Sequence, residues 1–242
     1  MKHLKTIMGI LVVLVAVSCG KTTSSDKGQV VFDVSSNQQI VDMTKSNVSD
    51  FTELPSVSEF TVTITGTDYN WTGTIAEWEE STLLQAGNYT VTAIYGSLEE
   101  EGFDKPFFEG TMTFTVIGGE AVTVSIPVSL GNSVIKINCS EYFKKYYTDY
   151  TFNITRGASQ VVTFAKNETR AAFIDAYKFT ISGTLQSELK TYNFSKDYTN
   201  LDVATAYTFA FDVANVGGSS ITIQFKDGYT ETIELGDYEL NE

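Results

Sequence analysis

The chain of 242 residues holds two tryptophans, Trp71 and Trp78, which lie seven residues apart and close to Asp68 and Asn70. An indole face can stack on a sugar ring, while neighbouring carboxylate and amide groups hydrogen-bond to the sugar hydroxyls. These four residues are therefore the candidate ligand-binding site, with a surface glycan as the ligand. The alternative, which the sequence favours, is that one or both tryptophans fill the end of a β-sandwich as core residues.

A dense run of carboxylates, Glu99-Glu100-Glu101 followed by Asp104, offers oxygen atoms of the kind that bind Ca²⁺. Their spacing matches no calcium-binding loop. The two carboxylates of a glycosidase must flank the scissile bond, which neighbours in sequence seldom do. We therefore expect a solvated hairpin tip here, with no metal site and no catalytic pair.

Five aromatic residues between positions 142 and 150 surround Lys144 and Lys145. They can form a binding patch or a hinge between domains. The sequence favours a short helix that packs its aromatic face across a domain junction. Cys139 continues the apolar face of the preceding strand and is expected to be a buried, unreactive side chain.

The first 18 residues combine Lys2 and Lys5 with an apolar run from Ile7 to Val17. A membrane-spanning helix needs roughly 20 apolar residues, so this run is typical of a signal peptide instead. The small residues that lead to Cys19 resemble the lipoprotein box of bacteria, although Ala16 stands where leucine is commonest. That resemblance implies removal of residues 1–18 and lipidation of Cys19. The alternative is an ordinary secretory signal that carries a cysteine.

Removal of this leader excludes several kinds of chemistry. The single histidine, His3, is lost, so no histidine remains as a catalytic base or a zinc ligand. Loss of two lysines lowers the net charge from −14 to −16, which opposes binding to nucleic acid. No phosphate-binding glycine motif is present. We therefore predict a protein that is not an enzyme, uses no cofactor and binds no nucleic acid.

From residue 28 onward the apolar residues alternate with Thr and Ser, as they do in half-buried antiparallel strands. Nine such runs are centred on residues 62, 92, 114, 126, 137, 152, 179, 209 and 223. Helical patterns are short and fall at 76–82, 140–147 and 168–174. The class is all-β, in tandem antiparallel β-sandwich domains with a few short helices.

The chain also repeats itself. Residues 60–67 read FTVTITGT and residues 177–184 read YKFTISGT, and each copy is followed about 23 residues later by a further strand that contains Tyr89 or Tyr207. We therefore predict two domains of related topology that meet near Leu130. The predicted division is a leader at 1–18, an anchor and flexible tether at 19–27, and sandwiches at 28–130 and 131–242.

The leader, the Leu-x-Ala-Gly-x-Tyr-Thr-Val segment at 84–91, the acidic loop that follows and Phe108-Glu109-Gly110 together resemble a known family. Its members are lipoproteins of gut Bacteroidetes, grouped as domain of unknown function 4493. The resemblance covers most of residues 28–242.

More loosely, a lipid anchor before two sandwiches is similar to the fimbrillin-like pilus proteins (transthyretin-like folds). In that group an Arg-directed protease trims the first strand, and a strand of a neighbouring subunit fills the groove. This chain has no arginine between Cys19 and Arg156. Thr169-Arg170-Ala171-Ala172 looks like such a cleavage site but lies in the second domain. The resemblance therefore implies an anchor, a tip or an adhesin that does not polymerise by that route.

Together these patterns predict a non-catalytic protein of a Gram-negative cell envelope, held at the outer membrane or cell surface by lipidated Cys19. Its partners would be the membrane and either fimbrial subunits or surface glycans. The leading function is an adhesin or a fimbria-like anchor, tip or assembly component. The alternative is a glycan-binding surface lipoprotein of a polysaccharide-uptake system, with Trp71 and Trp78 as its platform.

Overall fold

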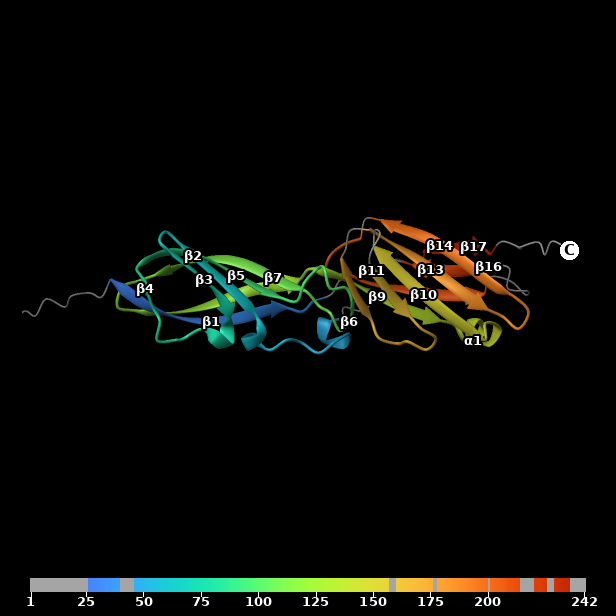
Figure 1. The fold of residues 1–242 in the computed structure, drawn as a ribbon, viewed down its shortest axis with the longest axis horizontal. Coiled ribbons are helices and arrows are strands. Elements are labelled where there is room, and N and C mark those ends of the chain that lie inside the picture. Colours follow the sequence, from blue (N-terminus) through green and yellow to red (C-terminus); the bar gives the residue numbers. More distant parts are fainter. Residues whose placement is uncertain are drawn as a thin grey trace, which may run out of the picture.

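The computed structural model describes residues 26–39, 46–156, 160–175, 178–199, 201–213, 220–225 and 229–235 (Figure 1). The predicted signal peptide, Cys19 and nearly all of the predicted tether at 19–27 lie outside these residues. Within the described residues, no helix has the length and apolar character needed to cross a membrane.

The first half of the chain forms one seven-stranded sheet in the order β3-β2-β5-β7-β8-β1-β4. Its strands are β1 (Lys27–Asn37), β2 (Thr61–Gly66), β3 (Tyr69–Thr74), β4 (Leu83–Gln85), β5 (Gly87–Tyr95), β7 (Phe108–Val116) and β8 (Ala121–Leu130). β1 runs parallel to β8, and the other pairs are antiparallel. Three short 3-10 helices, η1 (Val48–Asp50), η2 (Val57–Glu59) and η3 (Ile75–Glu77), lie in the connections.

This sheet folds over onto itself between β7 and β8. The two strands pair at only two positions, Phe108 with Leu130 and Glu109 with Ser129. At the next position a Cβ on Gly110 would collide with the Pro127 carbonyl oxygen, so the close crossing requires glycine. The fold brings Phe32 of β1 to 5.9 Å from Phe114 of β7, measured between ring centroids, and so encloses a core.

The second half forms two sheets that face each other. One has the order β11-β10-β13-β14 and the other β17-β16-β15-β9-β12-β6. The strands are β6 (Gly102–Phe103), β9 (Asn132–Cys139), β10 (Asp149–Arg156), β11 (Gln160–Phe164), β12 (Ala172–Asp175), β13 (Lys178–Gln186), β14 (Thr191–Thr199), β15 (Ala206–Val213), β16 (Ser220–Phe225) and β17 (Tyr229–Glu234). The rings of Phe152 and Phe211, 4.4 Å apart, join the two sheets through one aromatic core.

The all-β prediction is confirmed, since strands form at each of the nine alternating runs. The second half is a sandwich of two sheets, whereas the first half differs from the prediction in being one sheet that folds over. Of the three predicted helices, only 140–147 contains an α-helix, α1 (Glu141–Tyr146). Residues 75–77 form a 3-10 helix. The helix predicted at 168–174 is wrong, because Ala172–Asp175 is strand β12 between β9 and β6.

Only the first part of the sequence repeat has a shared packing reason, because Tyr89 lies on β5 beside β2, whereas Tyr207 lies on β15 in the sheet that does not contain β13. Gly66 of β2 and Gly183 of β13 hold equivalent positions in the two copies, and a Cβ at either would collide with an aromatic ring. The ring belongs to Tyr89 of β5 in the first copy and to Phe194 of β14 in the second. Each glycine therefore leaves room for an aromatic side chain of the neighbouring strand to lie flat against the glycine's own strand.

The two halves meet over a very short connection. β8 ends at Leu130 and β9 begins at Asn132, so Gly131 alone separates them. Gly131 donates its N–H to the Phe107 carbonyl oxygen, and the Asn132 side chain accepts from the Phe107 N–H. The first-half core also includes Phe173 of β12. The predicted domain boundary at 130 stays a prediction, because contacts cross it. Phe173 of the second half packs in the first-half core, and β6, which precedes the boundary, pairs with β12 after it.

The described body is long, with the two halves arranged end to end (Figure 1). At one end, here called the β1 end (residues 26–27, 83–86 and 117–120), Ala86 donates to the Asp26 carbonyl and Gly119 to the Lys27 carbonyl. At the other, the α1 end (residues 141–148 and 186–191), Thr148 donates its N–H to the Gln186 carbonyl at 2.8 Å. The helix therefore lies far from the junction, and the expectation that its aromatic face packs across that junction is wrong.

Candidate functional site

The two tryptophans lie against each other, but they differ in exposure. The 3-10 helix η3 carries the chain from β3 to Trp78, which is only 8% exposed and donates its indole N–H to the Val30 carbonyl at 2.9 Å. Its ring lies 5.1 Å from that of Phe32 and 5.0 Å from that of Trp71. Trp78 is therefore a core residue, which matches the alternative that the sequence favoured.

The other residues of this candidate site reach solvent. Trp71 is half-buried on β3, while Asp68 and Asn70 are exposed in and beside the β2–β3 turn. A sugar would meet part of one indole face rather than a platform of two. Binding of a glycan at Trp71 stays a prediction, and the burial of Trp78 disfavours its direct contact with a ligand.

The acidic loop makes contacts that the sequence did not suggest. The Glu101 side chain is 2% exposed, and its carboxylate oxygen Oε1 lies 2.9 Å from Nε of Arg156 on β10. The same oxygen accepts the backbone N–H of Asp175, whose carboxylate lies 2.9 Å from the Arg156 guanidinium. A carboxylate of the first half is thus buried against Arg156 and the backbone of Asp175 in the second half.

Arg170 makes a second set of contacts with the same loop. Its guanidinium carbon lies 4.5 Å from the centre of the Phe103 ring, and the guanidinium also reaches Asp104 at 3.4 Å and Glu168 at 2.9 Å. The Arg170 contacts hold the pKa of the Glu168 carboxyl at about 2, so this pair weakens only as the pH falls below about 4.5 toward 2. We call Glu101, Phe103, Asp104, Arg156 and Arg170 the junction clasp.

The junction clasp corrects the expectation of a solvated hairpin tip at Glu101, whereas Glu99, Glu100 and Asp104 are exposed as expected. Among the described residues, no group of three or more His, Cys, Asp or Glu side chains is arranged to hold a metal ion. The loop uses its carboxylates to bind arginine across the junction instead. The signal that could have found it is the arginine count, because the chain after Cys19 contains only Arg156 and Arg170.

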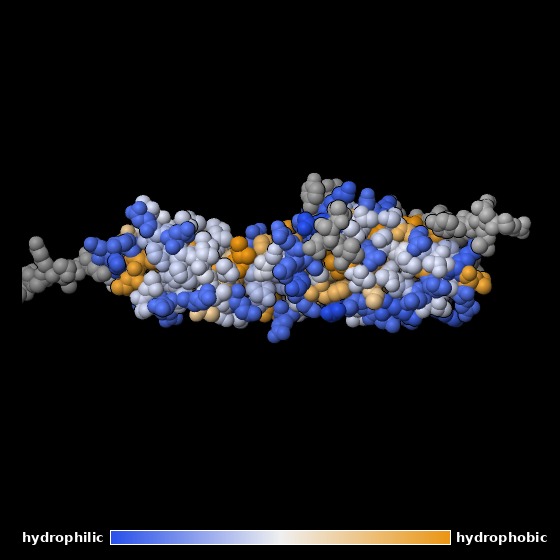
Figure 2. All heavy atoms as spheres, in the orientation of Figure 1, coloured by the Kyte–Doolittle hydropathy of each residue, from blue (hydrophilic) through white to orange (hydrophobic). Residues whose placement is uncertain are grey.

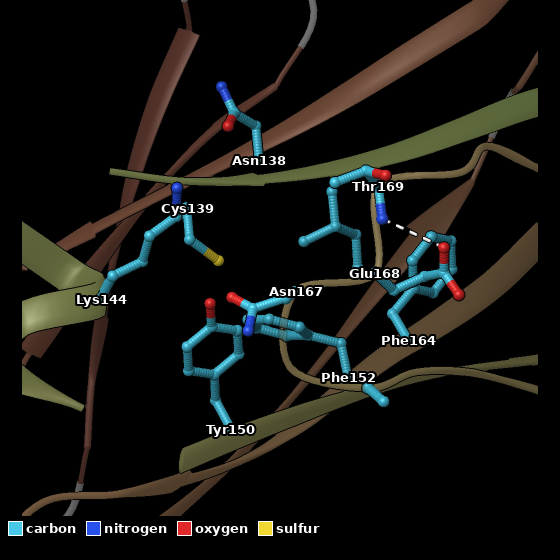
Figure 3. Close-up of a pocket in the computed structure, with 11 residues that line it drawn as sticks. Asn138, Cys139, Lys144, Tyr150, Phe152, Phe164, Asn167, Glu168 and Thr169 are labelled. Atoms are coloured by element: carbon cyan, nitrogen blue, oxygen red, sulfur yellow. Dashed lines mark hydrogen bonds between the residues drawn. The ribbon is translucent and has the colours of Figure 1, made fainter. Parts of the chain in front are cut away.

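A small cavity of about 120 Å³ lies in the second half, between β9, α1, β10 and the residues after β11 (Figure 3). Cys139, Tyr150 and Asn167 point into it, with Lys144 at its edge. The cavity is well below the roughly 300–1,000 Å³ of sites for drug-sized ligands. Burial raises the pKa of the Cys139 thiol to about 12, so the thiolate is scarce at neutral pH.

Cys139 is therefore expected to be inert. With a pKa of about 12, roughly 10⁻⁴ of the thiol is ionised at pH 8, and thiolate is the reactive form. In a Cys19→Ser protein, where Cys139 is the only thiol, we expect no measurable reaction with an aromatic disulfide reagent in the folded state at pH 8 over an hour, and complete reaction in denaturant. Rapid labelling of the native protein, with its circular dichroism unchanged, would contradict the buried placement.

Beyond Gln29, no described strand pairs with the outer edge of β1. β4 pairs with β1 only over Lys27–Gln29. At the following residue of β1, the Val30 carbonyl accepts the indole N–H of Trp78. Farther along, a groove of about 140 Å³ lies between β1 and the η1–η2 segment, lined by Val34, Ser36, Leu54, Pro55, Phe60 and Phe108. An apolar groove beside a strand edge suits an extended peptide that adds a strand.

These features define the class as an all-β protein with an apolar groove beside the edge of β1. The chain belongs to the family Domain of unknown function (DUF4493), whose sequence profile matches residues 26–236. No curated protein matches the sequence significantly.

Solved structures with a similar course include a fimbrial assembly protein of Parabacteroides distasonis, at 10% identity and a TM-score of 0.45 over 86% of this chain and 98% of that one. A candidate cell adhesion protein of Bacteroides uniformis is similar at 8% identity and a TM-score of 0.48 over the same shares. A candidate polysaccharide-binding protein of Bacteroides thetaiotaomicron is similar at 10% identity and 0.45, over 86% and 98%. Likenesses of this size assign neither a fold nor a function.

The sequence that looks like a protease site lies where cleavage would be hindered. Thr169 and Arg170 both donate their N–H groups to the Glu168 carboxylate, and Ala171 and Ala172 after the arginine are buried. Ala172 already pairs with Phe103 and Ile135 in the sheet. A protease would have to pull β12 out of that sheet before it could bind the segment.

Proposed function

We propose that this chain is a non-catalytic, lipid-anchored protein of the cell envelope that serves adhesion as a component of a fimbria-like surface assembly. The observation that carries the proposal is the direction of the body relative to its anchor. The predicted lipid site, Cys19, precedes the start of β1 by eight residues, and β1 begins at one end of a long molecule (Figure 1). An anchor at the β1 end leaves the α1 end to project.

Two further features support an assembly role. The edge of β1 and its apolar groove offer backbone groups and side-chain pockets to an added strand. The junction clasp joins the two halves through buried and half-buried ion pairs, which suits a part that must transmit force along its length. The net charge of −14 for the whole chain discourages contact with anionic surfaces.

A test of the envelope placement compares the wild-type protein with a Cys19→Ser variant in the native cell. We expect the wild type to partition into detergent, to take up a labelled fatty acid and to be stained by antibody on intact cells. The variant should lose the label and leave the membrane fraction. A wild-type protein that carries no fatty acid, or that antibody reaches only after lysis, would contradict the proposal.

The glycan-binding alternative depends on Trp71, which alone of the two tryptophans combines partial exposure with polar neighbours. It predicts that Trp71→Ala abolishes retention on an immobilised surface polysaccharide while the protein stays folded, with its melting temperature lowered by only a few degrees. Asn70→Ala, an exposed neighbour, serves as the graded control. An unchanged retention for both variants would remove this alternative.

A further inference from the structure

One end of the six-stranded sheet has apolar side chains buried on both of its faces. β12 is the clearest case, because its side chains alternate between the two cores of the body. Ala171, just before the strand, and Phe173 belong to the first-half core, whereas Ala172 and Ile174 belong to the second-half core. Successive side chains of a strand point to opposite faces, so β12 lies between the two cores with one face toward each.

The strands beside β12 continue the same two faces in register. The row that faces the first-half core consists of Phe173, Val134 of β9 and Ala206 of β15. The row one position along faces the second-half core and consists of Phe103 of β6, Ala172, Ile135 of β9 and Tyr207 of β15. We call these two rows the shared wall. β6 and β9 lie where the two halves meet in Figure 1.

The edges and the last residue of β12 also contact both halves. β6, which precedes the junction in sequence, pairs with one edge of β12, and β9 pairs with the other. Asp175 donates its backbone N–H to the Glu101 carboxylate of the first half, and its own carboxylate pairs with Arg156 of the second half. β12 is therefore held by both halves on its faces, at its edges and at its end.

The shared wall closes the first-half core at the junction. Val134 and Phe173 are fully buried in that core, although neither belongs to the first-half sheet. If the second half unfolded, the apolar side chains that these two residues cover would meet water, and the hydrophobic effect opposes that exposure. On the face seen in Figure 2, the atoms of the two halves meet without a gap.

We propose that the shared wall makes the two halves one cooperative unit, which folds, unfolds and orients as a whole. Two units of about 100 residues, each with its own core, are ordinarily able to fold and move independently. Here unfolding of the second half removes β9, β12 and β15, and so uncovers the first-half core as well. The inference goes beyond the proposed role at the cell envelope and does not depend on the lipid anchor.

The single residue between the halves does not act as a hinge under this inference. Gly131 donates its N–H to the Phe107 carbonyl at 2.8 Å, and a Cβ at this position would lie 2.6 Å from the Phe107 ring. Close packing against that ring therefore accounts for the glycine. The α1 end is then held at a fixed direction from the β1 end.

The chain carries a natural probe in each half for a test of this inference. Trp71 and Trp78 are its only tryptophans and lie in the first half, while Cys139, the only thiol of a Cys19→Ser protein, lies in the second-half core. Urea unfolding is followed by tryptophan fluorescence and by a short pulse of an aromatic disulfide reagent. We expect the two probes to give one midpoint, within about 0.3 M urea. A larger separation would overturn the inference.

A core variant far from the wall tests whether stability is transmitted. Leu185→Ala, at a fully buried site toward the α1 end, should lower the tryptophan midpoint by about 1 M urea, as much as it lowers the Cys139 midpoint. Leu189→Ala, at a nearby position that is 93% exposed, is the matched control and should move neither midpoint. A tryptophan midpoint that Leu185→Ala leaves unchanged would show that the halves unfold independently.

An insertion distinguishes the wall from the short connection as the source of the coupling. A flexible segment of about eight Gly and Ser residues is inserted beside Gly131. Because longer loops cost little and the wall is not covalent, the two midpoints should still coincide. Midpoints that separate in this variant would overturn the role of the wall. The proposed function is decided separately, by the Cys19→Ser comparison on cells.

Discussion

Replacing Arg156 with methionine is expected to lower the free energy of unfolding by about 2–4 kcal/mol, because the substitution leaves the carboxylate of Glu101 buried without its cation. A third of the Arg156 side chain reaches solvent, so the loss falls below that of a fully buried pair. Urea unfolding followed by circular dichroism measures it. Asp175 would lose the same partner.

Arg170→Met is the matched control, since it removes the other arginine of the junction clasp, whose side chain is 55% exposed and pairs with Asp104 and Glu168, at 55% and 18% exposure. Its cost should be smaller than that of Arg156→Met, at about 1–2 kcal/mol, because solvent screens its ion pairs. The double variant Arg156→Met/Glu101→Gln should recover part of the loss, because the uncompensated charge is gone. Equal costs for the two arginine variants would contradict the burial of Glu101.

The second large effect is expected at Trp78. Truncation to alanine should cost about 3–5 kcal/mol, because it empties a site packed against Phe32 and Trp71 and leaves the Val30 carbonyl without its donor. Trp78→Phe keeps a ring in the site but cannot donate to that carbonyl, so it should cost about 1–3 kcal/mol. Thermal and urea unfolding measure both.

Trp71→Ala shows whether Trp71 contributes to stability, to ligand binding or to both. This residue is half-buried and contributes chiefly its edge contact with Trp78, so the expected loss is about 1–2 kcal/mol. If Trp78→Ala were as stable as the wild type and lost binding to a polysaccharide, the assignment of Trp78 to the core would be wrong.

The strands were predictable because their signal is local. Val124, Ile126 and Val128 alternate with polar residues, and only one face of β8 is buried. The same reasoning failed at Ala171-Ala172-Phe173-Ile174, where a short apolar run does not distinguish a helix from a strand buried on both faces. β12 is a strand because β9 and β6 lie on either side of it, and neither is near it in sequence.

The sites were less predictable than the strands for a related reason. A run of glutamates is usually solvated, and nothing near Glu101 in sequence indicates that Arg156, 55 residues later, would bury it. The sequence does not decide whether Trp78 is a core residue or a ligand-binding residue, because this depends on the contact of its indole N–H with the Val30 carbonyl of β1.

The most direct measurement of the central claim is an unboiled SDS gel of material sheared from the cell surface, blotted for this protein. Cells that carry the wild-type gene are compared with cells that carry the Cys19→Ser variant. If the chain works in a surface assembly, the wild type should give a ladder of high-mass species, or migrate with one, that collapses on boiling and is missing from the variant. A single band near the mass of the mature chain, unchanged by boiling, would contradict the claim.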